Sequence, residues 1–119
     1  MSVLLYDYLR PVNGVLIITI NGIRATLDDA GSFRNKLLHE IQDGCKIIIV
    51  NLEKVEFIDS TFLGAIVVGW KNITAKEGAL VLTNLNVKVK DLLTLTQLDK
   101  KLNIAATVED ALLLFKASQ

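Results

Sequence analysis

The chain has 119 residues, of which 51% are hydrophobic and 22% charged, and this is typical of one globular domain spanning residues 1–119. The 13 Lys and Arg residues are balanced by 13 Asp and Glu residues, so there is no positive surplus with which to bind nucleic acid. A single cysteine, Cys45, excludes an internal disulfide, and a single histidine, His39, excludes a metal site built from several His or Cys ligands.

No apolar run approaches the roughly 20 residues that span a bilayer. The longest are Val15 to Ile20 and Ile47 to Val50. Met1 to Tyr8 carries neither a basic start nor a long apolar stretch, so no signal peptide or lipid anchor is expected. We therefore expect a soluble, cytoplasmic protein with no direct membrane insertion.

Two short aliphatic runs come first in the chain. They are Val3 to Leu9 and Val15 to Ile20, and the segment between them contains Asn13-Gly14, a pair that suits a tight turn with positive φ. The pattern predicts a β-hairpin.

The next pattern has helical spacing. Apolar residues recur at intervals of three and four from Asp29 to Ile41, and Asp28 or Asp29 can cap the free amides of the first turn. Gly44 is expected to end this helix.

The middle of the chain alternates strand and helix. Lys46 to Leu52 is apolar almost throughout, which favours a central strand covered on both faces. Thr61 to Ala75 predicts a largely buried helix that Gly78 ends, and Ala79 to Thr83 predicts a second buried strand.

The last third repeats this alternation. Val87 to Leu102 has helical spacing, and Asn103 to Ala106 can form a short strand. Thr107 with Asp110 three residues later resembles a capping box before a final helix.

The order of these elements predicts an α/β domain with a mixed, mostly parallel sheet of about five strands and about four helices. Lys46 to Leu52 is expected at its centre, between Val15 to Ile20 and Ala79 to Thr83. Binding sites in such sheets lie beyond the carboxyl ends of the strands, so the segment after Leu52 is the place to search. The residues expected to be buried are Ile48, Val50, Leu63, Val67, Leu93 and Leu112.

The segment from Phe57 to Gly64 changes from strand to helix and carries three consecutive cap-forming residues, Asp59, Ser60 and Thr61. One or two of them are enough to cap a helix, a contribution of about 1 kcal/mol. The remaining hydroxyls lie where the free amides and dipole of a helix N-terminus also favour a phosphate.

Catalytic chemistry is sparse. No glycine-rich phosphate loop is present, so no nucleotide cofactor is expected. His39 lies late in a predicted helix, and Cys45 adjoins a buried strand, where packing is its usual role. An enzyme that used Asp59 and Ser60 would lack an accompanying base or oxyanion donors, so we expect no enzyme activity.

The run from Ile49 to Gly64 resembles the signature segment of STAS domains, named for sulfate transporters and anti-sigma factor antagonists. Its most specific part is Asp59-Ser60-Thr61 followed by Leu63-Gly64, in its proper place after the third strand. The resemblance continues through Glu77 to Leu82, Val89 to Lys100 and Thr107 to Leu112, and so covers nearly the whole chain.

This resemblance implies a STAS-like domain that acts as an anti-sigma factor antagonist without catalysis of its own. In that family the unphosphorylated form binds an anti-sigma factor serine kinase and releases a sigma factor. The kinase phosphorylates a serine that matches Ser60, with Thr61 as the second candidate acceptor, and a phosphatase resets the phosphoserine. The expected partner-binding residues are Asp28, Asp59, Ser60, Thr61, Phe62 and Leu63.

Two positions depart from the family pattern. Phe62 stands where the family usually has glycine, and its ring is either buried or projects into the partner's footprint. Gly22 is followed by Ile23-Arg24-Ala25 where the family often has an acidic residue, a role that Asp28 could take. The alternative function is a non-phosphorylated STAS subunit of a membrane lipid transport or stress-signalling complex.

Overall fold

The computed structural model describes residues 4–117, so the predicted strand residue Val3 lies outside the described residues. Its elements follow the predicted order, with two short strands and one 3-10 helix in addition. They are β1 (Leu5–Leu9), β2 (Val15–Asn21), β3 (Arg24–Ala25), α1 (Leu27–Gln42), β4 (Ile47–Asn51), β5 (Phe57–Ile58), α2 (Ser60–Ala75), β6 (Ala79–Thr83), α3 (Val87–Leu95), the 3-10 helix η1 (Leu98–Lys100), β7 (Asn103–Ala105) and α4 (Val108–Ala117).

The main sheet has the strand order β1-β2-β4-β6-β7. β1 runs antiparallel to β2, as predicted for the hairpin, and the other neighbours are parallel. In the register of the sheet Ile48 lies between Leu16 and Leu80. This confirms a mixed, mostly parallel sheet with the Lys46 to Leu52 strand at its centre.

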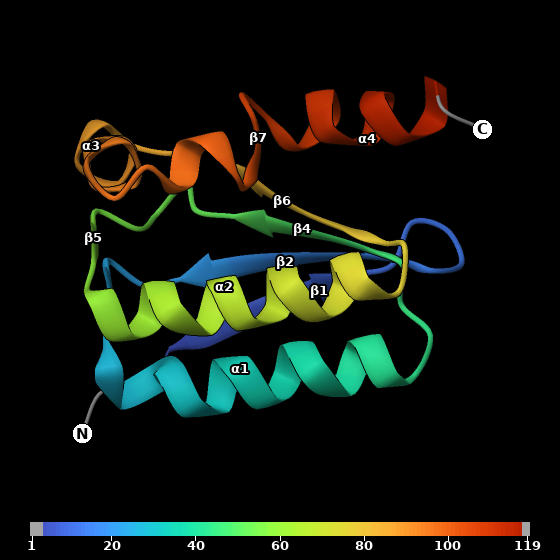
Figure 1. The fold of residues 1–119 in the computed structure, drawn as a ribbon, viewed down its shortest axis with the longest axis horizontal. Helices are drawn as coiled ribbons and strands as arrows, with labels where there is room; N and C mark the ends of the chain where they lie inside the picture. Colours follow the sequence, from blue (N-terminus) through green and yellow to red (C-terminus); the bar gives the residue numbers. More distant parts are fainter. Residues whose placement is uncertain (1–3, 118–119) are drawn as a thin grey trace.

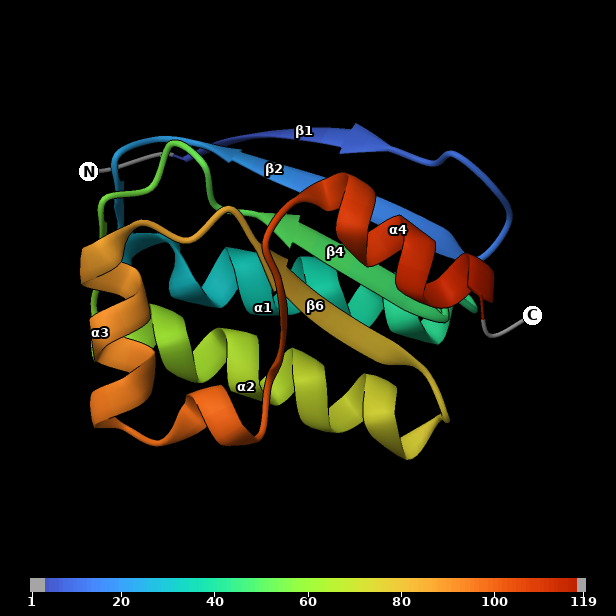
Figure 2. The same ribbon diagram turned by 90° about the horizontal axis from the view of Figure 1, so that it is seen from above.

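Helices cover both faces of this sheet. α1 and α2 lie against one face, α4 lies against the other, and α3 lies beyond the carboxyl ends of β4 and β6 (Figures 1 and 2). Ile48 and Val50 belong to the core under α1 and α2, whereas Ile49 belongs to the smaller core that includes Ala111 of α4. The almost wholly apolar sequence of β4 follows from this double coverage.

Close packing of α1 on α2 depends on a glycine. A Cβ atom at Gly69 would lie 2.6 Å from the Leu37 Cδ1 atom, and Leu37 is fully buried. The absence of a side chain at Gly69 therefore lets the two helices approach each other over the sheet.

Most of the predicted burial is confirmed. Ile48, Val50, Leu63 and Leu93 are buried. Val67 and Leu112 are only partly buried, with Leu112 packed against the smaller core, so the prediction that they are buried was wrong for both. Within residues 4–117 no helix combines the length and apolarity needed to cross a membrane.

Two local predictions were wrong, and one strand pairing was not predicted. Neither Asp28 nor Asp29 caps α1: the N-cap is Thr26, and the Asp29 carboxylate instead accepts a hydrogen bond from the Leu4 amide at 3.0 Å. The helix predicted to reach Leu102 ends at Leu95, because the backbone turns into the left-handed region at Gln97, with φ of 61°. The pairing of β3 with β5 was missed, since two-residue strands carry no periodicity.

Candidate functional site

The site lies where α1 and α2 both begin, at the carboxyl end of the parallel strands (Figure 1). β3 leads into α1, and β5 leads into α2. Because β3 and β5 pair in parallel, with Arg24 opposite Phe57 and Ala25 opposite Ile58, the two helices start side by side. The segment after Leu52 therefore lies beyond the carboxyl ends of the parallel strands, and its role as a binding site stays a prediction.

Asp59 is the N-cap of α2 and makes more contacts than a cap requires. Its Oδ1 atom accepts a hydrogen bond from the Phe62 amide at 2.8 Å, and its Oδ2 atom accepts one from the Leu27 amide at 2.7 Å. Its own amide donates to the Ala25 carbonyl of β3 at 3.2 Å. Asp59 is therefore bonded to the starts of both helices and to the small sheet between them.

Ser60 and Thr61 are exposed in the first turn of α2. Neither hydroxyl makes a hydrogen bond within residues 4–117. Asp59 already caps α2, so these two hydroxyls are not needed to cap the helix. Both are accessible to solvent and to a partner protein.

Phe62 and Leu63 lie under this surface. Phe62 is fully buried and stacks on Phe33 of α1, with ring centroids 4.8 Å apart, and Leu63 is 5% exposed. The phenyl ring at the usual glycine position thus fills the core between the two helices and does not project outward. As buried residues, Phe62 and Leu63 support the surface from below, and the expectation that they contact a partner directly does not fit their burial.

Asp28 is exposed in the first turn of α1 and borders a hollow of about 460 Å³ with Asp59. The same hollow is lined by Arg24, whose guanidinium lies 4.3 Å from the centroid of the Phe57 ring. The structure therefore brings Asp28, Asp59 and the two hydroxyl residues to one end of the molecule.

Sequence reasoning missed the apolar part of this surface. Ile23, Leu27 and Phe57 are 60%, 64% and 41% exposed. Apolar side chains are ordinarily assigned to the core, whereas these three are exposed around the paired strands β3 and β5. Exposed apolar side chains beside polar ones are common where proteins bind each other.

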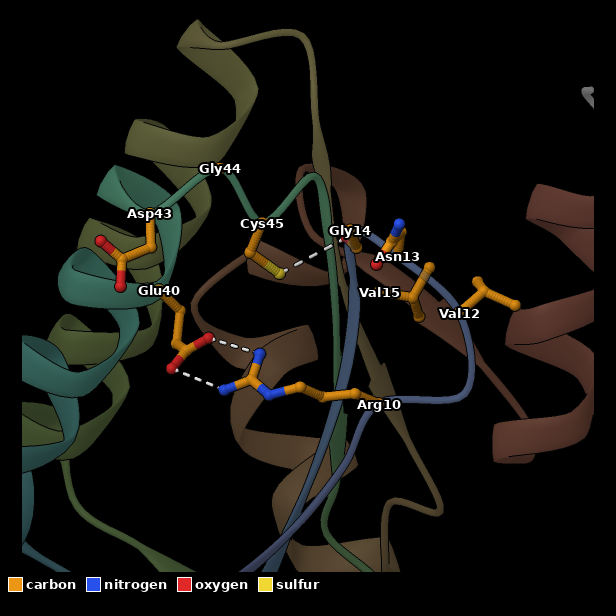
Figure 3. Close-up of a pocket in the computed structure, with 9 residues that line it drawn as sticks. All are labelled: Arg10, Val12, Asn13, Gly14, Val15, Glu40, Asp43, Gly44 and Cys45. Carbon is orange, nitrogen blue, oxygen red and sulfur yellow. Dashed lines mark hydrogen bonds and ion pairs between the residues drawn. The ribbon is translucent and has the colours of Figure 1, made fainter.

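A second cavity, of about 420 Å³, lies at the opposite end of the strands (Figure 3). The Arg10 guanidinium occupies one side and binds Glu40 through two contacts of 2.7 and 2.8 Å. Cys45 lies nearby with its thiol 3.5 Å from the Gly14 carbonyl, and burial raises the pKa of this thiol. The Arg10 guanidinium is already paired with Glu40, and the raised pKa favours the protonated form of the Cys45 thiol. We therefore assign both side chains a structural role.

Among residues 4–117 no three His, Cys, Asp or Glu side chains are grouped to hold a metal ion. His39 contacts Asp43 at 3.3 Å in the last turn of α1. The features that stand out are thus the exposed hydroxyls of α2 and the carboxylate that bridges the two helix starts.

Comparison with known proteins agrees with this geometry. The family model described as "STAS domain" matches residues 9–111. A protein from Thermotoga maritima, named as a candidate anti-sigma factor antagonist, is 33% identical over 102 residues, which are 85% of this chain and 89% of that protein. A homologue from Thermotoga neapolitana is 30% identical over 98 residues, covering 82% of this chain and 87% of its own length.

Solved structures agree as well. The crystal structure of a candidate anti-sigma factor antagonist from Thermotoga maritima has a TM-score of 0.80 at 31% identity, covering 90% of this chain and 91% of that one. Unphosphorylated SpoIIAA, an anti-sigma factor antagonist, has a TM-score of 0.82 at 21% identity, covering 95% and 97%, which shows a shared fold. The chain belongs to the STAS domain family.

Proposed function

We propose that this protein is an anti-sigma factor antagonist that binds an anti-sigma factor serine kinase and thereby releases a sigma factor. Phosphorylation of Ser60 by that kinase switches binding off, and a phosphatase restores it. The names of the Thermotoga relatives support the general role. The domain acts in this scheme as a protein-binding module, with catalysis supplied by its partners.

The observation that carries the proposal is the state of the Ser60 side chain. It is exposed at the first position of α2, and its hydroxyl makes no hydrogen bond within the described part of the chain. A kinase can reach such a hydroxyl without unfolding the helix. Thr61 is exposed one position later and is the second candidate acceptor.

The fold tolerates the product of this reaction. A phosphoryl group adds about 1.5 to 2 negative charges at neutral pH. At the start of a helix the free amides and the dipole favour such a charge. The Bacillus protein SpoIIAA, whose fold this chain shares with a TM-score of 0.72, has been solved in a phosphorylated form, which supports the same reasoning.

The docking surface comprises Asp28, Asp59, Ser60 and Thr61 with the exposed apolar side chains Ile23, Leu27 and Phe57 around them. A phosphate on Ser60 places a dianion in the middle of this surface, beside Asp59. A partner that carries an acidic group here is repelled, and a partner that packs against the apolar side chains has to bury the dianion without a counter-charge, which costs binding energy. Phosphorylation therefore acts on the contact with the partner and leaves the core unchanged.

The test uses calorimetric titration against candidate anti-sigma factor kinases, beginning with any that is encoded beside this protein's gene. We expect Ser60→Asp to weaken binding at least about tenfold, roughly 1.4 kcal/mol, with little change in thermal stability. Ser60→Ala should bind like the unmodified protein and resist phosphorylation from labelled ATP. Thr61→Ala is the matched control and should still be phosphorylated.

Two results would contradict the switch. The first is that the unmodified protein and Ser60→Asp bind the kinase with equal affinity. The second is that Ser60→Ala incorporates as much phosphate as the unmodified protein. If incorporation disappears in Thr61→Ala instead, the acceptor is Thr61. If neither residue is phosphorylated and binding is unaffected, the non-phosphorylated STAS subunit of a membrane lipid transport or stress-signalling complex becomes the better hypothesis.

A further inference from the structure

Asp59 caps two helices with one carboxylate. Its Oδ1 atom serves the Phe62 amide in the first turn of α2, and its Oδ2 atom serves the Leu27 amide, which is the first amide of α1. The N-cap of α1, Thr26, makes no capping hydrogen bond with its own side chain. Helix starts leave free amides that need an acceptor. α1 therefore takes a capping acceptor from a residue 32 positions away.

This arrangement places Ser60 next to the residue on which both helix starts depend. A negative charge on Ser60 repels the Asp59 carboxylate and competes with it for the free amides at the start of α2. Hydrogen bonds to an ionised carboxylate are stronger than hydrogen bonds between neutral groups. Displacement of the Asp59 carboxylate therefore weakens its hydrogen bonds at the starts of both α1 and α2.

We propose that the Asp59 carboxylate is a positioning group that couples the charge on Ser60 to the first turn of α1 through the Leu27 amide. In terms of the proposed function, on which its regulatory use rests, a phosphate on Ser60 changes the part of the docking surface formed by Leu27 and Asp28 as well as its own surroundings. In this scheme Asp59 acts mainly through its hydrogen bonds within the protein and not through direct contact with the partner. The first turns of α1 and α2 then change together when Ser60 is phosphorylated.

The first test needs no kinase. A serine at the N-cap can accept a hydrogen bond from the amide three positions later in the same helix. It has only one side-chain oxygen, which cannot also accept a hydrogen bond from the Leu27 amide of α1. In Asp59→Ser we therefore expect hydrogen exchange at the Leu27 amide to rise at least about tenfold while the Phe62 amide keeps its protection. Asp28→Ser is the control, since it also removes a carboxylate at the start of α1, and it should leave both amides protected.

A second variant breaks the same contact from the other side. Proline is favoured at the first position of a helix, where it removes only an amide hydrogen. Thr26 has φ of −130° and ψ of −177°, the extended conformation that a residue before proline prefers, and the Leu27 side chain is 64% exposed. Leu27→Pro should therefore fold with Asp59 intact, and Leu27→Ala is its control because it keeps the amide hydrogen.

The coupling is measured by adding Ser60→Asp to each of these two backgrounds. In Leu27→Ala we expect the added charge to shift the NMR amide signals of Asp28 and Asp29, as in the parent protein. In Leu27→Pro we expect those shifts to fall to less than about half, because the connecting hydrogen bond is gone. Equal shifts in both backgrounds, or an unchanged Leu27 amide in Asp59→Ser, would overturn the proposal.

These experiments distinguish failure of the Asp59 coupling from failure of the proposed function. If Ser60→Asp weakens kinase binding but does not move the α1 signals, the switch stands and the coupling is refuted. If the α1 signals move through Leu27 but affinity for the kinase is unchanged, the coupling stands and the switch is refuted.

Discussion

Glu40 is a buried carboxylate that two cations keep ionised. Its side chain is 7% exposed, and its Oε1 atom lies 2.7 Å from Arg10 Nη1, while Lys36 Nζ lies 3.2 Å from Oε2. The hydrogen bond from Arg10 lowers the pKa of Glu40 to about 2, against the opposing effect of burial, with a smaller contribution from Lys36. This contact attaches the end of the hairpin strand β1 to the last turns of α1.

The lowered pKa predicts how stability depends on pH. A carboxyl group whose pKa is lower in the folded state contributes stability above its ordinary pKa of 4.5, and this contribution is lost as the pH falls from 4.5 toward 2. The Arg10 side chain is half exposed, so solvent screens its interaction with Glu40. We therefore expect this ion pair to contribute on the order of 2 kcal/mol to the free energy of unfolding. Urea unfolding of Glu40→Gln at pH 7 should show that loss, and its difference from the parent protein should shrink near pH 2.5.

The control for this prediction is Asp43→Asn, which removes an exposed carboxylate from the same end of α1. An exposed ion pair contributes little, about 0 to 1 kcal/mol, so this variant should follow the parent protein. A constant difference between Glu40→Gln and the parent protein at all pH values would mean that Glu40 acts by packing and not by charge.

At the scale of single elements, the end of α3 shows how a local backbone state overrides a helical pattern. Apolar residues continue at helical spacing past Leu95, yet the Thr96 hydroxyl donates to the Leu92 carbonyl at 2.8 Å and closes the last turn. Gln97 then adopts φ of 61° and ψ of 16°, so the chain leaves the helix axis and enters η1. Hydrophobic periodicity reports which side chains are covered and does not report this reversal.

The left-handed conformation at Gln97 predicts a stabilising substitution. Glycine adopts this conformation without steric cost, whereas a residue with a Cβ atom does so at a cost. Gln97 is exposed and loses little packing. Gln97→Gly should therefore increase the free energy of unfolding by about 0.5 to 1 kcal/mol in chemical denaturation.

Lys90→Gly provides the comparison, because Lys90 is exposed inside α3 with ordinary helical geometry. There glycine should decrease the free energy of unfolding by about 0.5 to 1 kcal/mol. Destabilisation by both substitutions would show that the αL residue at the end of α3 carries no strain.

At the scale of the whole molecule, stability depends on a sheet whose central strand is covered on both sides. Ile48 is fully buried between neighbouring strands and under α1 and α2. Ile48→Ala should reduce the free energy of unfolding by about 2 to 5 kcal/mol, since it removes buried methyl groups and leaves a cavity. Equilibrium unfolding in urea, with Leu113→Ala of the exposed face of α4 as control, measures this.

Leu113 is 61% exposed, so its truncation should change stability by less than about 0.5 kcal/mol. Equal effects of the two substitutions would remove Ile48 from the core and would contradict the arrangement of the sheet. The comparison thus tests the layered architecture on which the position of the docking surface depends.

The element order, the central strand and the position of Ser60 at a helix start were predictable from the sequence. They depend on patterns within about 20 consecutive residues: the apolar run from Lys46 to Leu52, helical spacing after Thr61, and cap-forming residues between them. Asp59 was correctly predicted near a cap, because Asp is among the residues preferred at the N-cap of a helix.

The tertiary structure decided what those residues contact. The Asp59 carboxylate reaches Leu27, which is 32 positions away, and Arg10 reaches Glu40, which is 30 positions away. The burial of Phe62 and the exposure of Leu27 likewise follow from how α1 packs beside α2 and how β3 pairs with β5. No local pattern specifies such contacts, because they form only when the sheet and its covering helices bring distant segments to the same end of the molecule.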